Sequence, residues 1–134
     1  MKGVGKYMKI GGRMKMTRQQ MKQERFEYFL NTVLHKCQKE QWNKIGFTTS
    51  SLEERHINSI VESLRKKAKE RQIILQVEEI KPVNYFADGI KQAITCDSVV
   101  FVERYTYSYY KDMLNCMELL QKEEIPIYGV VAYR

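Results

Sequence analysis

The chain lacks several patterns that would assign it to a class at once. No apolar run approaches the ~18 residues of a membrane span, and the N-terminus has basic residues without the apolar core or the cleavage site of a signal peptide. Cys37, Cys96 and Cys116 have no CxxC spacing and stand among apolar residues. We therefore expect buried, reduced thiols in a cytoplasmic protein.

Metal and nucleophile motifs are missing as well. His35 and His56, the two histidines, have no cysteine or carboxylate cluster at ligand spacing. No G-x-S-x-G elbow supports a Ser-His-Asp arrangement, although the sequence alone leaves one open. Helix capping and strand-end solvation explain the carboxylate pairs at 53–54 and 78–79. We expect no metal site, no cofactor and no catalytic residue.

The net charge of +7 is concentrated at one end of the chain. Residues 1–25 contain eight basic side chains and one acidic, whereas the other 109 residues carry 15 of each sign. A nucleic-acid-binding domain spreads positive charge over a folded face, so this distribution argues against nucleic acid as a partner.

The N-terminal residues predict a separate segment. Residues 1–16 hold four glycines and no stable period, which predicts a flexible basic leader before a single domain at 17–134. The leader is either a solvated tail or a contact for a protein partner or an anionic membrane surface, which would make the protein membrane-peripheral. The basic residues of that contact would be Lys2, Lys6, Lys9, Arg13, Lys15 and Arg18.

Apolar periodicity predicts that strands and helices alternate. Thr17 is the expected N-cap of a helix of about 20 residues, with an apolar stripe between Phe26 and Cys37. Strands are expected at 44–49, 72–77, 98–103 and 127–132, and helices at 51–71, from Asn84 or Asp88 to 94, and at 110–120 with Tyr110, Met113, Leu114, Met117 and Leu120 on one side. The order predicts a three-layer α/β fold: a mainly parallel four-stranded sheet with helices on both faces, preceded by an N-terminal helix.

The junction after the first predicted strand is the most informative segment. A phosphate-binding loop belongs there, but residues 50–57 contain no glycine and no Gly-Lys-Ser/Thr. Ser51 and Glu54 fit the S-x-x-E capping box, so the helix is expected to begin at once. Glu53 and Glu54 would repel a triphosphate by about 1–4 kcal/mol per close pair. We expect no ATPase or kinase activity.

Polar residues follow the predicted strands at their carboxyl ends, where parallel sheets bind ligands. They are Thr48, Thr49, Ser50, Ser51, Glu78, Glu79, Glu103 and Arg104. Ser50 and Ser51, at a helix N-terminus, are candidates for holding a small anion. Tyr105, Tyr107, Tyr109 and Tyr110 cluster after the third strand. They either pack a loop and helix start or form a phosphorylation or partner-recognition patch.

Three stretches resemble the bacterial tyrosine kinase (BY-kinase) domain, a member of the MinD-like branch of P-loop ATPases. They are Asp88-Gly89-Ile90 through Cys96-Asp97-Ser98-Val99-Val100-Phe101-Val102-Glu103-Arg104, then Leu119-Leu120, then Ile127-Tyr128-Gly129-Val130-Val131. Thr48-Thr49-Ser50-Ser51 is similar to the lead-in of the family's phosphate loop, but the loop does not follow. Of the family's E-x-x-R-x-x-R contact helix only Glu24 matches, with Glu27 and Leu30 in place of the arginines.

The resemblance implies a non-catalytic binding or regulatory module, linked by analogy to capsular or exopolysaccharide synthesis. Two alternatives stay open. One is an enzyme that acts on a phosphorylated small molecule at the strand ends, and the other is a membrane-surface or nucleic-acid adaptor that uses the leader. The long apolar stripe of the first helix predicts a homodimer.

Overall fold

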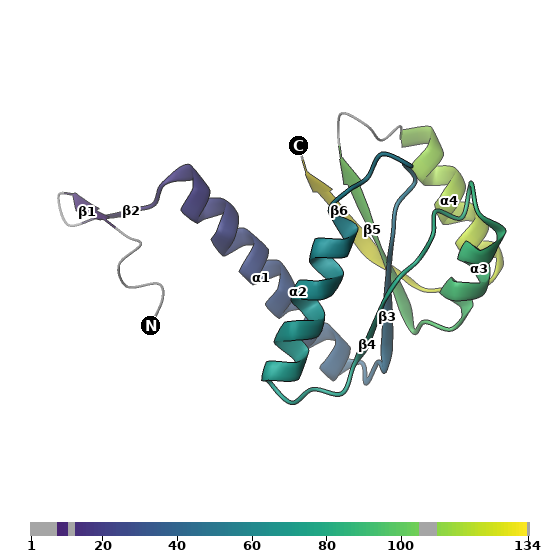
Figure 1. The fold of residues 1–134 in the computed structure, drawn as a ribbon, viewed down its shortest axis with the longest axis horizontal. Coiled ribbons are helices and arrows are strands. Elements are labelled where there is room, and N and C mark those ends of the chain that lie inside the picture. Colours follow the sequence, from purple (N-terminus) through teal and green to yellow (C-terminus); the bar gives the residue numbers. More distant parts are fainter. Residues whose placement is uncertain (1–7, 11–12, 105–109, 134) are drawn as a thin grey trace. The chain divides into compact units, whose positions relative to one another are not determined.

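The computed structural model describes residues 8–10, 13–104 and 110–133 (Figure 1). The chain divides into two compact units, residues 1–36 and residues 37–134. The boundary between leader and domain after residue 16 stays a prediction.

The first unit contains a hairpin and most of a long helix. Strands β1 (Met8–Ile10) and β2 (Arg13–Lys15) pair antiparallel. Helix α1 (Arg18–Lys39) follows and extends into the second unit. Thr17 caps it as predicted: its hydroxyl accepts the Gln20 N–H at 3.1 Å, and the Gln20 amide oxygen accepts the Thr17 N–H at 2.8 Å. The hairpin was not predicted, because strands of three residues are too short to show apolar alternation.

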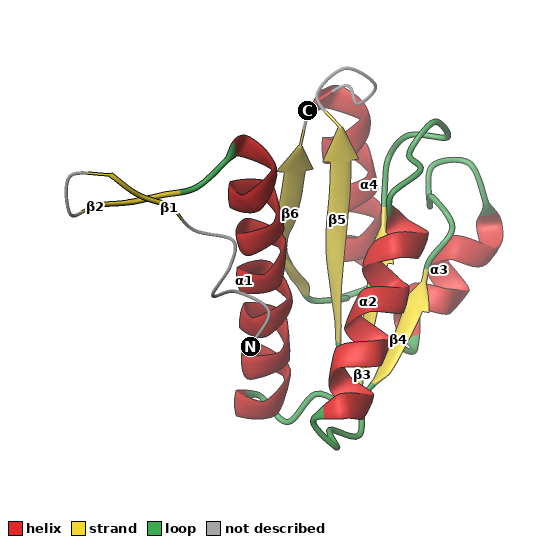
Figure 2. Ribbon diagram, turned by 60° about the vertical axis from the view of Figure 1, so that its left-hand side comes forward, coloured by secondary structure: helices red, strands yellow, loops and turns green. Residues whose placement is uncertain are grey.

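The second unit is built on a four-stranded parallel sheet, which confirms the predicted fold class. The strands β3 (Lys44–Thr48), β4 (Gln76–Glu79), β5 (Ser98–Arg104) and β6 (Ile127–Tyr133) lie in the order β4-β3-β5-β6 and are all parallel (Figure 2). Helix α2 (Ile57–Glu70) lies on one side of the sheet, with α3 (Ala87–Ile94) and α4 (Tyr110–Lys122) on the other (Figure 1).

Strand β5 is the centre of the core because six of its seven residues are buried. Val99 and Phe101 pack with Ala93 of α3 and Leu120 of α4 in one apolar cluster. Val100 and Val102 alternate with them and so face the other side. Full burial of each such side chain contributes about 1.5–3 kcal/mol. The uninterrupted apolar run of this strand is the pattern of a central parallel strand.

Two predicted boundaries are wrong. Helix α2 begins at Ile57 and not at Ser51, because residues 51–56 form turns closed by their own side chains. Strand β4 begins at Gln76 and not at Gln72, since its pairing with β3 starts opposite Lys44. The apolar run at 73–75 that suggested a strand is therefore a connector.

Two helical details also differ from the expectation. Helix α3 begins at Ala87, with Phe86 as an N-cap that makes no side-chain cap bond. In α4 the fully buried residues are Cys116 and Leu120, whereas Tyr110 is 72% exposed and Leu114 is 38% exposed. The predicted stripe was therefore too wide. No helix of the described residues is long and apolar enough to cross a membrane.

Candidate functional site

The carboxyl ends of β3 and β5 bring three predicted site residues together. Thr48 pairs with Phe101 in the sheet, so the chain after β3 runs beside the last residues of β5. Thr49, Ser50 and Glu103 meet there, and all three are buried. Parallel strands that end at one edge produce this convergence.

Glu103 is the centre of the cluster. The residue is 4% exposed. Its carboxylate accepts the backbone N–H of Ser50 at 2.8 Å, the Ser50 hydroxyl at 3.0 Å and the Thr49 hydroxyl at 3.4 Å. Hydrogen bonds to a charged acceptor are about twice as strong as neutral ones. Three donors therefore hold a buried carboxylate at the start of the loop.

Four other backbone N–H groups between Ser50 and His56 donate to groups of residues 49–54. The N–H of Ser51 donates to the Thr49 hydroxyl at 3.2 Å, and that of Glu53 donates to the Ser51 hydroxyl at 3.1 Å. The N–H of Glu54 donates to the Ser51 carbonyl at 3.4 Å. The N–H of His56 donates to the carboxylate of Glu54 at 2.7 Å. In a phosphate-binding loop, such backbone N–H groups point at the ligand. Here they are already bonded to groups of the same chain.

Tyr133 closes the outer side of the same loop. Its hydroxyl donates to the Glu54 carboxylate, at 2.7 Å from the Oε2 atom. The His56 ring meets the Tyr133 ring edge to face, with 4.8 Å between centroids. Burial, and then the hydrogen bond and charge of Glu54, raise the pKa of Tyr133 above its usual range. The end of β6 is thus fastened to the loop after β3.

Asn84 joins a second loop to the first. Its side-chain amide donates to the Ser50 carbonyl at 3.2 Å, so the segment after β4 and the segment after β3 lie side by side. Within the described residues, the Thr48 hydroxyl and the Asn84 amide oxygen are buried and make no hydrogen bond. Buried polar atoms of this kind are commonly satisfied by water.

The other residues predicted at the strand ends differ in how they relate to this cluster. Glu79 ends β4 and is exposed, without a hydrogen bond to the cluster among the described residues. Arg104 ends β5, and its positive charge partly opposes the rise in the pKa of Tyr133 that burial and Glu54 cause. Asn84 and Tyr133 were not predicted as site residues. Tyr133 could have been predicted in the same way as Glu103, because it stands at the carboxyl end of β6, the neighbour of β5.

The residues of the predicted partner contact belong to the first unit or fall outside the described residues. Lys9 is in β1, Arg13 and Lys15 are in β2, and Arg18 begins α1. The remaining predicted contact residues, Lys2, Lys6, Tyr105, Tyr107 and Tyr109, fall outside the described ranges.

Neither metal binding nor thiol chemistry is built into the described part of the chain. It holds no group of three or more histidine, cysteine or acidic residues placed to share a metal ion. Burial raises the pKa of Cys37 and that of Cys116 to about 11 each, and it also raises the pKa of Cys96. Thiols with raised pKa values are poor nucleophiles. The three cysteines are buried and free, as predicted.

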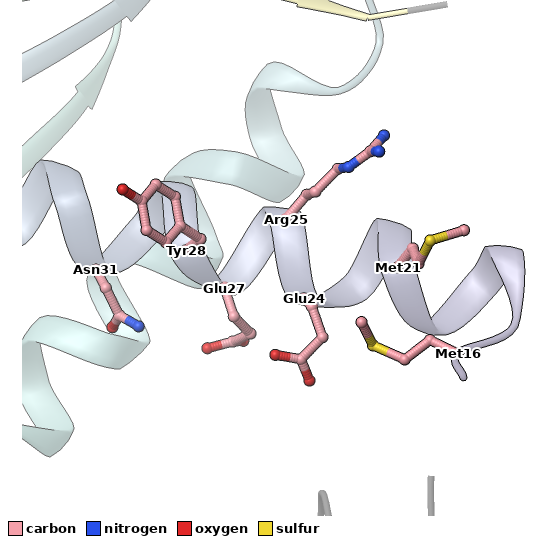
Figure 3. Close-up of a pocket in the computed structure, with 7 residues that line it drawn as sticks. All are labelled: Met16, Met21, Glu24, Arg25, Glu27, Tyr28 and Asn31. Atoms are coloured by element: carbon pink, nitrogen blue, oxygen red, sulfur yellow. The ribbon is translucent and has the colours of Figure 1, made fainter. Parts of the chain in front are cut away.

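Two surface hollows lie in the separate units. In the first unit, a hollow of about 570 Å³ is lined by Met16 and by residues of α1 (Figure 3); the lining residues of α1 are Met21, Glu24, Arg25, Glu27, Tyr28 and Asn31. In the second unit, a hollow of about 390 Å³ is lined by Lys44, Glu78, Asp88, Lys91, Gln92 and Thr95. Both are open and lined by flexible side chains, which gives them no fixed ligand geometry.

Comparisons with protein-family models, with curated proteins and with solved structures found no match to this chain.

Proposed function

We propose that residues 37–134 form a non-catalytic binding module on the frame of a P-loop ATPase, related to the BY-kinase domain that the sequence resembles. The parallel sheet, with a loop between β3 and α2 at its carboxyl edge, supports the frame. By analogy with that family, the module would serve capsular or exopolysaccharide synthesis.

The bond between Glu103 and Ser50 carries the proposal. In a working phosphate loop the first amides hold a phosphate, whereas here the Ser50 N–H holds a carboxylate of the same chain at 2.8 Å. A nucleotide would have to displace three hydrogen bonds to a buried charge. At about 1.5–3 kcal/mol for each such bond, the cost is on the order of 4 kcal/mol or more, about a thousandfold in affinity.

The two loops at this edge provide the proposed binding face. Leu52 is 60% exposed on the loop after β3, and Tyr85 and Phe86 are 53% and 41% exposed on the loop after β4. The Asn84–Ser50 bond connects the two loops. Aromatic side chains on loops that internal bonds hold in place suit recognition of a protein partner.

Calorimetric titration with ATP and Mg²⁺ tests the proposal. The wild-type chain is expected to give no binding heat up to 1 mM nucleotide and no release of phosphate. Micromolar binding accompanied by turnover would contradict the non-catalytic assignment. A nucleotide that binds here must displace the Glu103 carboxylate from Thr49 and Ser50. A Glu103→Ala variant that binds nucleotide more tightly than the wild type would therefore support the claim that Glu103 blocks the site.

A further inference from the structure

The turn between α2 and β4 presents an isoleucine to solvent. Ile74 is 93% exposed, the highest value among the large apolar side chains of the described residues. Its neighbours Ile73 and Leu75 are half-buried. An apolar side chain so fully exposed contributes nothing to the core of this unit.

The backbone holds Ile74 in this position. The N–H of Arg71 donates to the Lys67 carbonyl and that of Ile73 to the Ala68 carbonyl, at 3.1 Å and 2.8 Å, which closes the end of α2. Gln72 has a left-handed φ of 58°, which turns the chain away from the helix axis. On the far side, the Gln76 N–H donates to the Asn43 carbonyl at 2.9 Å. The turn is therefore bonded on both sides of Ile74.

Basic residues surround the turn. The segment from Glu62 to Arg71 has five basic and two acidic side chains, a net charge of +3, although the chain beyond residue 25 is neutral as a whole. Lys66 and Lys69 are exposed on the last turns of α2. Arg65 is fixed differently, since its guanidinium donates to the Val77 carbonyl at 2.6 Å and to Glu62 at 3.1 Å. It ties the end of α2 to β4 beside the turn.

We propose that the α2–β4 turn is a contact site for an anionic lipid surface. Ile74 would enter the boundary between headgroups and acyl chains, and Lys66 and Lys69 would meet the headgroup phosphates. The turn lies at one end of α2, beyond its last residues (Figure 1). The site belongs to the second unit and lies at the other end of the sheet from the strand ends that carry Glu103.

The apolar tip favours a membrane over nucleic acid. Phosphate contacts to a nucleic acid require the cations alone, and single-stranded recognition adds stacking on aromatic rings. Residues 65–75 contain no aromatic side chain. An exposed isoleucine adds affinity where an apolar environment receives it, as the acyl chains of a membrane do and a phosphate backbone does not.

Sedimentation of the full chain with vesicles tests the proposal. Vesicles of 30% phosphatidylglycerol in phosphatidylcholine are compared with pure phosphatidylcholine. Near an anionic membrane each lysine adds about fivefold to partitioning, so Lys66→Glu/Lys69→Glu is expected to lower it by about 25-fold or more. Ile74→Ser is expected to lower it by roughly five- to tenfold.

Matched controls carry the same chemical changes on α4. Lys111→Glu/Lys122→Glu removes two exposed lysines, and Leu114→Ser removes a partly exposed apolar side chain. Both controls are expected to partition as the wild type does. Equal partitioning of Ile74→Ser and the wild type would overturn the proposal. So would a Lys66→Glu/Lys69→Glu variant that loses DNA or RNA binding but keeps vesicle binding.

A fluorescent label locates the contact directly. The native cysteines are buried and have raised pKa values, so Ile74→Cys offers the one reactive thiol among the described residues. An environment-sensitive dye at position 74 is expected to shift to shorter emission wavelength with anionic vesicles and not with neutral ones. An unshifted dye on protein that pellets with the anionic vesicles would show that another part of the chain makes the contact.

Discussion

Replacing Glu103 with alanine is expected to be strongly destabilising. The change removes the acceptor of the Ser50 N–H, the Ser50 hydroxyl and the Thr49 hydroxyl, at 2.8, 3.0 and 3.4 Å. Ser50 and Thr49 are 2% and 3% exposed, so water replaces the lost acceptor poorly. With about 1–3 kcal/mol for each donor left unsatisfied, and with partial relaxation, we expect a loss of about 3–5 kcal/mol in the free energy of unfolding.

Glu103→Gln separates the charge from the volume. The glutamine keeps the shape but turns one acceptor into a donor that faces other donors, so we expect a loss of about 2 kcal/mol. Urea unfolding followed by circular dichroism measures both values. Glu53→Ala, an exposed carboxylate on the same loop, is the control and is expected to stay within about 0.5 kcal/mol of the wild type. Losses below about 1 kcal/mol for both Glu103 variants would refute this reasoning.

Two other parts of the fold give further predictions. Tyr133→Phe removes the hydroxyl that donates to Glu54 and is expected to cost about 0.5–1 kcal/mol and to speed hydrogen exchange of the loop amides. The folded state raises the pKa of Tyr133 above its ordinary 10.0. This hydroxyl therefore stabilises the fold below about pH 10, and the contribution is lost at higher pH as the phenol ionises. Unfolding midpoints measured above pH 10 for wild type and Tyr133→Phe should converge, and a constant gap would contradict the sign. Gly46→Ala is expected to cost about 1–3 kcal/mol, because its Cβ would lie 2.1 Å from Ile80 Cδ1, whereas Gly129→Ala meets nothing within 4 Å and should be close to neutral in thermal unfolding.

The strands and their order were predictable because burial on both faces leaves a strong pattern. Val99 to Val102 form an apolar run that reads as a central strand, and the structure places it there. Alternation of strands and helices then restricts the topology to a parallel sheet. The predicted convergence at the strand ends follows from the same rule, and Thr49, Ser50 and Glu103 meet there.

Other features depended on local bonds that the pattern does not encode. The S-x-x-E match at Ser51 predicted a helix start, but the Ser51 hydroxyl and the Glu54 carboxylate instead close successive turns. The side chains that favour an N-cap favour turns as well, and tertiary contacts decide between the two. Here the bond from Tyr133 to Glu54, across 79 residues of sequence, holds the carboxylate that caps the turn.

The role of Glu103 lay beyond the sequence for a related reason. The sequence identified Ser50 as a candidate for binding an anion and placed Glu103 near it. It did not show that the Glu103 carboxylate itself accepts the Ser50 N–H. Only the register of β3 against β5 brings the carboxylate to the Ser50 amide. The Ser50 amide therefore binds an anionic group of the same chain.

The most direct test of the central claim is chemical rescue of Glu103→Ala, because the substitution removes a fragment with the shape of acetate. Unfolding is measured in 0.5 M sodium acetate and in 0.5 M sodium chloride at pH 7. For an acetate Kd of about 0.1 M, the variant is expected to regain about 1 kcal/mol in acetate, whereas the wild type should gain nothing over chloride. Equal stability of the variant in the two salts, or an equal gain in the wild type, would contradict the claim that Glu103 fills an anion site at Ser50.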